Sequence, residues 1–223
     1  MIKITFMGAG STVFLRNVLG DCIYTDALKG MEIALYDIDG QRLEQSAAIL
    51  EAINKGNGCP ASIRSYLGAE NRRKALSGAD FVINAIQVGG YDPCTITDFE
   101  IPKKYGLRQT IGDTLGIGGI MRALRTIPVL EDFARDMQAV CPNAWFLNYT
   151  NPMSMLTGYM LRYTGVKTLG LCHSVQTCSK TLMDAIGMSD RLEGRRELIA
   201  GINHMGWLLY IRDRDGNDLY PEI

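Results

Sequence analysis

Short apolar runs alternate with amphipathic stretches along most of the chain, and this alternation sets the expected fold. Five runs have the length and residue types of buried strands and end near Gly, Asp or Asn: residues 2–7, 31–36, 81–85, 145–149 and 168–172. Between them, apolar residues recur at helical spacing after Asp39, a good N-cap residue. Another such stripe covers residues 120–137, where Pro128 is expected to bend the helix or start a second segment.

Strands and helices that alternate in this way predict parallel β-α-β units. We therefore expect an α/β fold with a Rossmann-like, doubly wound parallel sheet. The pattern changes near residue 197: residues 198–201 and 207–211 have strand character, and residues 213–217 have the composition of a hairpin turn. The predicted domains are an NAD-binding domain over residues 1–196 and the beginning of a second α+β domain over residues 197–223, apparently truncated.

Composition narrows the possible partners and the compartment. The chain has 223 residues and is 47% hydrophobic, enough to fill a sizeable core. Its 23 basic and 24 acidic residues nearly cancel, which argues against nucleic acid or an anionic membrane surface as a partner. No secretory signal or membrane-spanning run is visible. The six cysteines form no Cys-x-x-Cys pair, so we expect reduced thiols and a cytoplasmic protein.

A glycine-containing loop follows the first expected strand. Gly8 and Gly10 stand between that strand and a predicted helix, where backbone N–H groups can bind a pyrophosphate. Ser11 and Thr12 continue the loop, but the third glycine of the usual fingerprint is absent. Asp37, at the end of the second strand, is placed to accept hydrogen bonds from ribose hydroxyls and would repel a 2′-phosphate. The loop therefore predicts NAD rather than NADP, and the alternative is an α/β domain that binds no nucleotide.

The two histidines of the chain stand in segments that suggest a metal site. Cys172 ends the fifth expected strand, at the edge where open α/β sheets bind ligands, and His204 lies in the second domain. These two ligands would leave positions open for substrate, as in a catalytic metal site. His173 is expected on the opposite face of the strand from Cys172, as a candidate acid. The alternative is a small buried cysteine and histidines that make only local hydrogen bonds.

Two further segments carry candidate chemistry. Asn151 follows the fourth expected strand, where its amide can bind sugar hydroxyls or a nicotinamide, or simply form a turn before Pro152. Residues 112–119 form a glycine-rich loop before a helix that carries Arg122 and Arg125. This loop can bind an anion or lie beside the substrate, and a solvated helix face is the alternative for the arginines.

In this order, the segments resemble glycoside hydrolase family 4, whose NAD dependence separates it from hydrolases with two catalytic carboxylates. The similarity covers essentially the whole chain and is strongest to the α-galactosidase (melibiase) branch, while an α-galacturonidase branch shares parts of it. The segments that carry the resemblance are Gly8-Ala9-Gly10-Ser11-Thr12, Asp37-Ile38-Asp39, Gly89-Gly90-Tyr91, Asp113-Thr114-Leu115-Gly116, Gly118-Gly119-Ile120, Leu124-Arg125, Asn151-Pro152, Gly170-Leu171-Cys172-His173 and Gly201-Ile202-Asn203-His204.

The resemblance implies a role for each candidate residue. Cys172 and His204 match the family's manganese ligands, and Asn151 matches a residue that contacts the sugar beside the metal. His173 matches the position of a proposed acid, although the residue type there varies between branches. Asp113 matches an acidic position that tunes the base. The implied cofactors are NAD and Mn²⁺, and imidazole and thiolate ligands also suit other divalent metals.

The resemblance also implies a reaction and a substrate class. An α-galactoside or related sugar is oxidised at C3, deprotonated at C2, loses its C1 substituent by elimination and then adds water, while NAD is recycled. The metal stabilises the charge that develops on the sugar oxygens. Relatives assemble as dimers or tetramers, so we expect a homo-oligomer.

One departure from the family limits this interpretation, and two rival functions remain open. The family's general base, usually a tyrosine, lies downstream of residue 223, so we expect the chain alone to fold poorly or to hydrolyse nothing. One rival is an NAD-dependent 2-hydroxyacid dehydrogenase, which needs no metal and would keep its activity in EDTA. The other is an NAD-binding fragment without chemistry.

Overall fold

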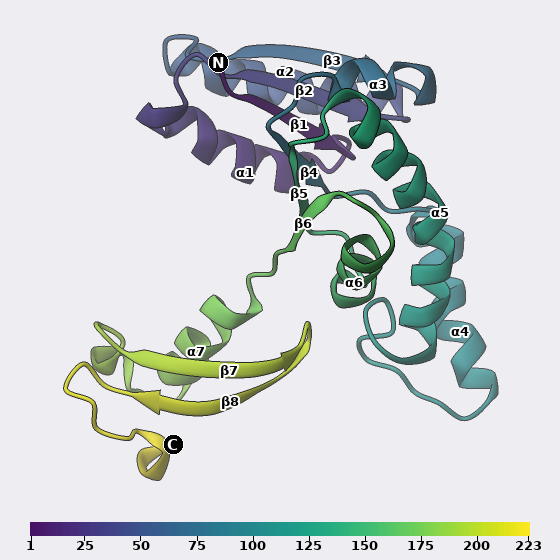
Figure 1. Cartoon of the computed structure of the whole chain (residues 1–223). Coiled ribbons are helices and arrows are strands. Elements are labelled where there is room, and N and C mark those ends of the chain that lie inside the picture. Colours follow the sequence, from purple (N-terminus) through teal and green to yellow (C-terminus); the bar gives the residue numbers. More distant parts are fainter. The chain divides into compact units, whose positions relative to one another are not determined.

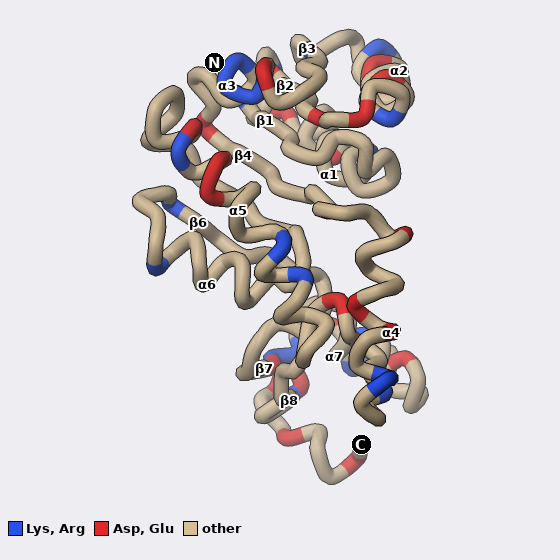
Figure 2. Tube along the Cα trace, turned by 90° about the vertical axis from the view of Figure 1, so that its right-hand side faces the viewer, with Lys and Arg blue, Asp and Glu red and all other residues tan.

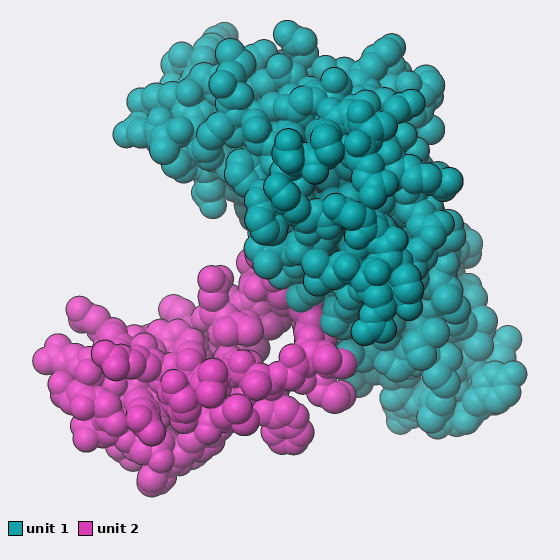
Figure 3. All heavy atoms as spheres, viewed as in Figure 1, with its two compact units in different colours: residues 1–170 teal, residues 171–223 magenta.

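The computed structural model describes all 223 residues and divides them into two compact units. Unit 1 comprises Met1–Gly170 and unit 2 comprises Leu171–Ile223, shown in teal and magenta in Figure 3. Acidic and basic residues are interspersed along both units (Figure 2), in keeping with the formal net charge of −1. No helix has the length and apolar character needed to cross a lipid bilayer.

A six-stranded parallel sheet forms the centre of unit 1 (Figure 1). The strand order is β3-β2-β1-β4-β5-β6, which is the order of a doubly wound dinucleotide-binding fold and confirms the predicted fold class. From β1, the chain adds β2 and β3 on one side of the sheet and β4, β5 and β6 on the other. The loops that follow β1 and β4 therefore border a crevice. The strands are β1 (Lys3–Met7), β2 (Glu32–Asp37), β3 (Ser62–Leu67), β4 (Phe81–Asn84), β5 (Trp145–Asn148) and β6 (Lys167–Gly170).

The sequence pattern did not reveal β3. This strand pairs with β2 only and lies at the edge of the sheet, where most of its side chains are exposed. An edge strand needs no continuous apolar run, so the residues of β3 are largely polar. The other five strands lie close to the predicted ranges, although β6 ends at Gly170, two residues before Cys172.

Helices cover both faces of the sheet. On one face, apolar residues of α1 (Thr12–Tyr24) and α2 (Gly40–Gly56) pack against β1 and β2. On the other, α3 (Arg72–Leu76), α5 (Gly116–Val140) and α6 (Met153–Tyr163) cover a second core. A π-helical turn at Gly90–Thr95 leads into α4 (Ile96–Lys104), which packs beside α5. The short 3-10 segments of unit 1 are Asp26–Leu28 and Ala69–Asn71.

Two helix predictions have different outcomes. Asp39 is the N-cap of α2, and its side chain accepts a hydrogen bond from the backbone N–H of Arg42 at 3.1 Å, as expected. Pro128 was expected to bend the second predicted helix or divide it, but α5 continues through Pro128 as one element of 25 residues.

Two glycines at the start of α5 are required by close packing. Gly118 and Gly119 lie inside the first turn of α5 and are buried. A Cβ atom on Gly118 would lie within 2.2 Å of the carbonyl oxygen of Gly112, so only glycine fits there. The Gly118 N–H donates to the side-chain oxygen of Gln109 at 3.0 Å, which occupies a donor that an anion would need. Whether this loop binds an anion or lies beside the substrate stays a prediction.

Unit 2 packs a helix against a two-stranded antiparallel ribbon. Its elements are α7 (Ser174–Ala185), β7 (Arg196–Ile202) and β8 (Met205–Arg212), with 3-10 turns at Ser189–Arg191 and Tyr220–Glu222. Met183, Ile211 and Leu219 form its small core. The sequence pattern changes at residue 197, and the predicted domain boundary was placed there. The compact units instead divide between residues 170 and 171, because α7 contributes apolar side chains to the core of unit 2.

The turn between β7 and β8 differs from the expectation. The hairpin turns at Asn203 and His204, whereas residues 213–217 form a later turn that follows β8. That later turn is held by the Asp213 carboxylate, which accepts from the backbone N–H groups of Asp215 and Asn217, both at 2.9 Å. A two-residue turn without glycine gives little compositional signal, and this explains why it was missed.

Candidate nucleotide and metal sites

The loop after β1 lies directly against the end of β4. Gly8 has a φ of +88°, and a Cβ atom on it would lie 2.7 Å from the carbonyl oxygen of Ala85. Its N–H donates to the carbonyl oxygen of Tyr36 at 3.0 Å. Only glycine satisfies both the left-handed backbone and the close approach. The loop is thereby fixed at the sheet edge where this fold binds ligands.

The Asp37 carboxylate organises the same loop. One of its oxygens accepts from the Gly10 N–H at 2.5 Å, and the other accepts from the N–H groups of Ile38 at 2.7 Å and Asp39 at 3.0 Å. An ionised carboxylate offers about four acceptor positions, so these three donors leave room for a ribose hydroxyl. Asp37 thus links the two segments that the sequence singled out for nucleotide binding.

Ser11 and Thr12 stand at the start of α1. Ser11 is the N-cap residue and makes no side-chain capping bond, so the first-turn N–H groups have no capping partner from it. The Thr12 hydroxyl lies 3.1 Å from that of Ser46, which is fully buried in α2. The interaction of Thr12 with α2 gives it a structural role in addition to its place in the predicted nucleotide loop.

A buried amide network joins the ends of β4 and β5, and only part of it was noticed in the sequence. Asn84 and Asn148 are register partners on these strands, and both are fully buried. The Asn84 amide donates to Asn148 at 2.9 Å and to the Thr150 hydroxyl at 3.0 Å. The Thr150 hydroxyl donates to the Ile86 carbonyl at 3.1 Å, so it ties together the loops after both strands.

The network supports Asn151, which follows Thr150 immediately and precedes α6. Asn151 is half-buried at the carboxyl edge of the sheet, the position expected for a ligand-binding side chain. The signal that reveals the network is that two buried apolar runs, residues 81–84 and 145–148, each end in asparagine. The side-chain oxygen of Asn84 is buried and has no hydrogen-bond partner.

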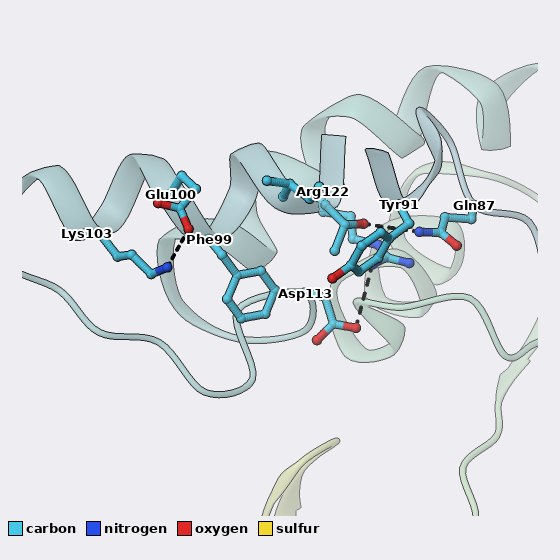
Figure 4. A pocket seen from close by; sticks show the side chains of 9 residues that line it. Gln87, Tyr91, Phe99, Glu100, Lys103, Asp113 and Arg122 are labelled. Atoms are coloured by element: carbon cyan, nitrogen blue, oxygen red, sulfur yellow. Dashed lines mark hydrogen bonds and ion pairs between the residues drawn. The ribbon is translucent and has the colours of Figure 1, made fainter. Parts of the chain in front are cut away.

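Asp113 borders a cavity of about 590 Å³ in unit 1 (Figure 4). Its carboxylate lies 3.6 Å from the guanidinium of Arg122, which comes from α5 and is only 9% exposed. At the same wall, the Gln87 amide donates to the Thr95 hydroxyl at 3.1 Å. The cavity is lined by Gln87, Tyr91, Thr95, Ile96, Phe99, Glu100, Lys103, Asp113 and Arg122.

The two arginines of α5 are not on a solvated helix face. Burial lowers the pKa of Arg122, and the negative charges of Asp113 and Asp98 only partly oppose this effect. Arg125 forms a bidentate pair with the buried Asp98, at 2.6 and 3.1 Å, and these hydrogen bonds raise its pKa. Arg125 therefore fixes α5 to α4, whereas Arg122 places a charge at the cavity. The different roles of Arg122 and Arg125 could not be predicted from the sequence, because both residues lie on one helix.

Cys172 and His204 come together within unit 2. The Cys172 sulfur lies 3.5 Å from Nε2 of His204, although 32 residues separate them. His204 lies in the β7–β8 turn with a φ of +87°, a left-handed backbone conformation that residues other than glycine rarely adopt. Backbone strain of this kind concentrates at functional sites. The turn thus holds an imidazole against a thiol at some conformational cost.

This pair fits a divalent metal with open coordination positions. A sulfur and a nitrogen that bind one ion at about 2.3 and 2.1 Å can lie no more than roughly 4.4 Å apart, whatever the angle between them. The observed separation of 3.5 Å is within that limit. No group of three or more His, Cys, Asp or Glu side chains is arranged for a metal, so the protein does not form a closed structural site of those ligands. Beside the pair, the Asn203 side-chain oxygen is buried without a partner.

Neighbouring groups favour the ionised form of Cys172. Partial burial alone would raise the pKa of this thiol, but hydrogen bonds from Ser174 and the Asn203 side chain together lower it below its ordinary value. The Ser174 hydroxyl lies 3.1 Å from the sulfur. By contrast, burial raises the pKa of Cys141 to about 11. Since a metal binds the thiolate, Cys172 is the better prepared ligand.

His173 does not lie opposite Cys172 on a strand, so that prediction is wrong. β6 ends at Gly170, and His173 occupies the N-cap position of α7 with helical backbone angles. The turn after β6, rather than strand alternation, therefore determines the direction of each side chain. The candidate role of His173 as an acid stays a prediction, as do the roles of Asp113 and Asn151.

Comparison with known proteins decides the family. The model of family 4 glycosyl hydrolases matches residues 3–188, and the model of that family's C-terminal domain matches residues 199–223. The chain belongs to glycosyl hydrolase family 4. It is 62% identical over its entire length to an alpha-galactosidase of Bacillus subtilis, of which it covers 50%. It is 35% identical to an alpha-galacturonidase of the same organism, with 93% of the chain and 46% of the relative covered.

Solved structures of family 4 proteins share the fold. The lplD protein of Bacillus subtilis has a TM-score of 0.85 and 32% identity, with 99% of this chain and 50% of that chain covered. A 6-phospho-alpha-glucosidase from gut microorganisms, solved with NAD and Mn²⁺, has a TM-score of 0.84 at 23% identity, covering 99% of this chain and 49% of that one. The chain thus spans about half the length of the family members it matches.

Proposed function

We propose that this chain supplies the cofactor and metal half of an NAD- and Mn²⁺-dependent α-galactosidase. The observation that carries the proposal is the 3.5 Å approach of Cys172 and His204 in a chain that also has a dinucleotide loop after β1. The alpha-galactosidase of Bacillus subtilis, 62% identical over the whole chain, supports the substrate class. Membership of family 4 removes the ground for a simple 2-hydroxyacid dehydrogenase.

In this proposal, NAD would accept and return a hydride at the sugar, and the divalent metal would stabilise negative charge on sugar oxygens. The chain's own residues position these groups. Gly8, Gly10, Ser11 and Thr12 would hold the pyrophosphate at the start of α1, and Asp37 would accept hydrogen bonds from the ribose. Because Asp37 is already fixed by backbone donors, it binds without reorganising the loop.

Other residues would act on the sugar. Asn151 would donate to a sugar hydroxyl, and the amide network behind it would hold the loop in place. His173 would give a proton to the departing oxygen, at the N-terminus of α7. Asp113 would set the charge of the cavity through its pairing with Arg122. The general base would come from the part of the family's sequence that follows residue 223.

The charges of the cavity favour a galactoside over a galacturonide. Each basic side chain at its wall has an acidic partner, since Lys103 pairs with Glu100 and Arg122 pairs with Asp113. A uronate carboxylate binds most strongly to a cation, and both cations at this wall are already paired. A neutral sugar needs only the hydroxyl and amide groups that Gln87, Tyr91 and Thr95 supply.

Activity measurements test the proposal. We expect the 223-residue chain alone, with NAD, Mn²⁺ and reductant, to give no turnover of p-nitrophenyl α-galactoside, because it spans about half the length of the alpha-galactosidase it matches. Co-expression with the remaining half of the Bacillus subtilis alpha-galactosidase should restore turnover that needs NAD and stops in EDTA. Turnover that persists in EDTA would reject the metal-dependent reaction. Preference for the galacturonide would move the protein to the other branch.

A substitution at Asp37 tests the nucleotide assignment separately. Asp37→Ser removes the ribose acceptor and the negative charge, so NAD affinity should fall about tenfold. The ratio of NADP affinity to NAD affinity should rise. Calorimetric titration of the chain with each nucleotide measures both changes. Asp39→Ser is the matched control, because a serine also caps a helix and Asp39 is the cap of α2. Equal losses in the two variants would contradict a direct contact by Asp37.

A cytoplasmic location and assembly into a homo-oligomer complete the proposal. The proposed location rests on the six cysteines, which form no Cys-x-x-Cys pair and are expected to be reduced. Sedimentation of the chain, alone and with the second half, measures the oligomeric state. An NAD-binding fragment without chemistry remains the rival, and turnover of the completed protein is the result that excludes it.

A further inference from the structure

One face of the β7–β8 ribbon is apolar and exposed from the turn as far as the bulge. Ile202 pairs with Met205 and Ala200 pairs with Trp207 in the antiparallel register. Leu198, which pairs with Tyr210, lies on the same face. We call Leu198, Ala200, Ile202, Met205 and Trp207 the outer ribbon face. Its large side chains are 45–71% exposed, with Trp207 the most exposed among them.

The opposite face of the ribbon is already used. Leu208 and Ile211 contact the core formed with Met183 and Leu219. A surface ribbon normally alternates apolar residues toward the core with polar residues toward water. Here the residues on both sides are apolar, which is the pattern of strands that are covered on both faces. A two-stranded ribbon in water is also marginally stable without further packing.

The comparisons indicate what covers this face. The family's C-terminal domain begins to match at residue 199, within β7, so the ribbon is the first part of that domain present in the chain. The match covers residues 199–223, while the Bacillus subtilis relative has as much sequence again outside the match. Exposed apolar patches of this kind mark interaction surfaces.

We propose that the outer ribbon face is the docking surface for the polypeptide that continues the family's C-terminal domain, whether it is joined to this chain or separate. The partner is expected to present an apolar surface to Trp207 and its neighbours. Trp207 is the expected anchor, because tryptophan contributes most often to the energetic centre of an interface. The inference concerns association and does not depend on catalysis.

Co-expression tests the inference directly. The tagged chain is produced together with the half of the Bacillus subtilis alpha-galactosidase that lies beyond its match, and the amount that co-purifies is measured. We expect a stable complex with the parent chain and about a tenfold smaller yield with Trp207→Ser. Leu198→Ser, on the same face, should also reduce the yield. Leu161→Ser is the matched control, since Leu161 is 60% exposed on α6 of unit 1.

Fluorescence adds a readout at the face itself. The chain has two tryptophans, so Trp145→Phe leaves Trp207 as the sole reporter. Its emission should shift to shorter wavelength in the complex, because docking removes the indole from water. Three results would overturn the proposal: no complex with the parent chain, equal yields with Trp207→Ser and Leu161→Ser, or a self-association that only Trp207→Ser abolishes. None of these readouts uses turnover, so a failed galactosidase assay leaves the test intact.

Discussion

Replacing Cys172 with serine is expected to abolish the metal site. The thiolate is the softer of the two proposed ligands, and a serine hydroxyl does not ionise to replace it near neutral pH. Replacing a residue that only hydrogen-bonds to a metal ligand lowers metal affinity about ten- to a hundredfold. Replacing the ligand Cys172 itself should therefore lower metal affinity about a hundredfold or more. Titration of the chain with Mn²⁺ and with Co²⁺, by calorimetry and by absorption of the Co²⁺–thiolate band, measures the change.

Cys178→Ser is the matched control for this variant. Cys178 is an exposed free thiol in α7, six residues after Cys172. Its replacement should leave metal affinity within about twofold of the parent, because the substitution is chemically the same but lies outside the pair. If Cys172→Ser bound either metal as tightly as Cys178→Ser does, the assignment of Cys172 as a ligand would be wrong.

His204→Gly tests the second proposed metal ligand. At a φ of +87° an L-residue other than glycine costs about 1–2 kcal/mol, which glycine would relieve. The variant should therefore lose the metal site without lowering the melting temperature. Metal loss combined with an unchanged or higher melting temperature would show that the histidine is kept in this turn for binding rather than for stability.

The sequence predicted those parts of the fold that arise from local, strongly patterned segments. Four of the five predicted strands, β2, β1, β4 and β5, lie inside the sheet, where strands covered on both faces must be apolar. β6 is an edge strand, but it lies within an apolar run, residues 168–172, and so was also predicted. β3 escaped because it lies at the edge and needs no such run. Likewise, Gly8 and Asp37 could be singled out, since each follows a buried strand at a fixed position in the fold.

The candidate site was less accessible to sequence reasoning, because its contacts join distant segments. The cavity beside Asp113 is built from the loop after β4, α4 and α5, and nothing in a helical stripe distinguishes Arg122 from Arg125. The hairpin turn at His204 has no glycine, so its position became evident only from the pairing of β7 with β8. The sequence singled out Cys172 and His204 as a candidate metal pair, the resemblance identified manganese as the metal, and the structure supplied their proximity.

Gly8→Ala is expected to weaken both the stability of unit 1 and its binding of NAD. A left-handed backbone costs an alanine about 1–2 kcal/mol, and the added methyl would lie 2.7 Å from the Ala85 carbonyl oxygen. The atoms nearest to the added methyl belong to the backbone, which cannot turn aside as a flexible side chain can. The loop must therefore move away from β4. Strain and displacement together should destabilise the protein by about 3 kcal/mol, which lowers the melting temperature by roughly 6–12 °C.

NAD affinity should fall by tenfold or more, or about 1.4 kcal/mol, in the same variant, since the displaced loop is the proposed pyrophosphate site. Gly30→Ala separates the two effects. Gly30 has a φ of +84° but no atom within 4 Å of the added methyl, and it precedes β2, at the edge of the sheet opposite the nucleotide loop. This control should show only the milder loss of stability and bind NAD as the parent does. If Gly8→Ala retained parental NAD affinity despite its lower melting temperature, the loop after β1 would not be the pyrophosphate site.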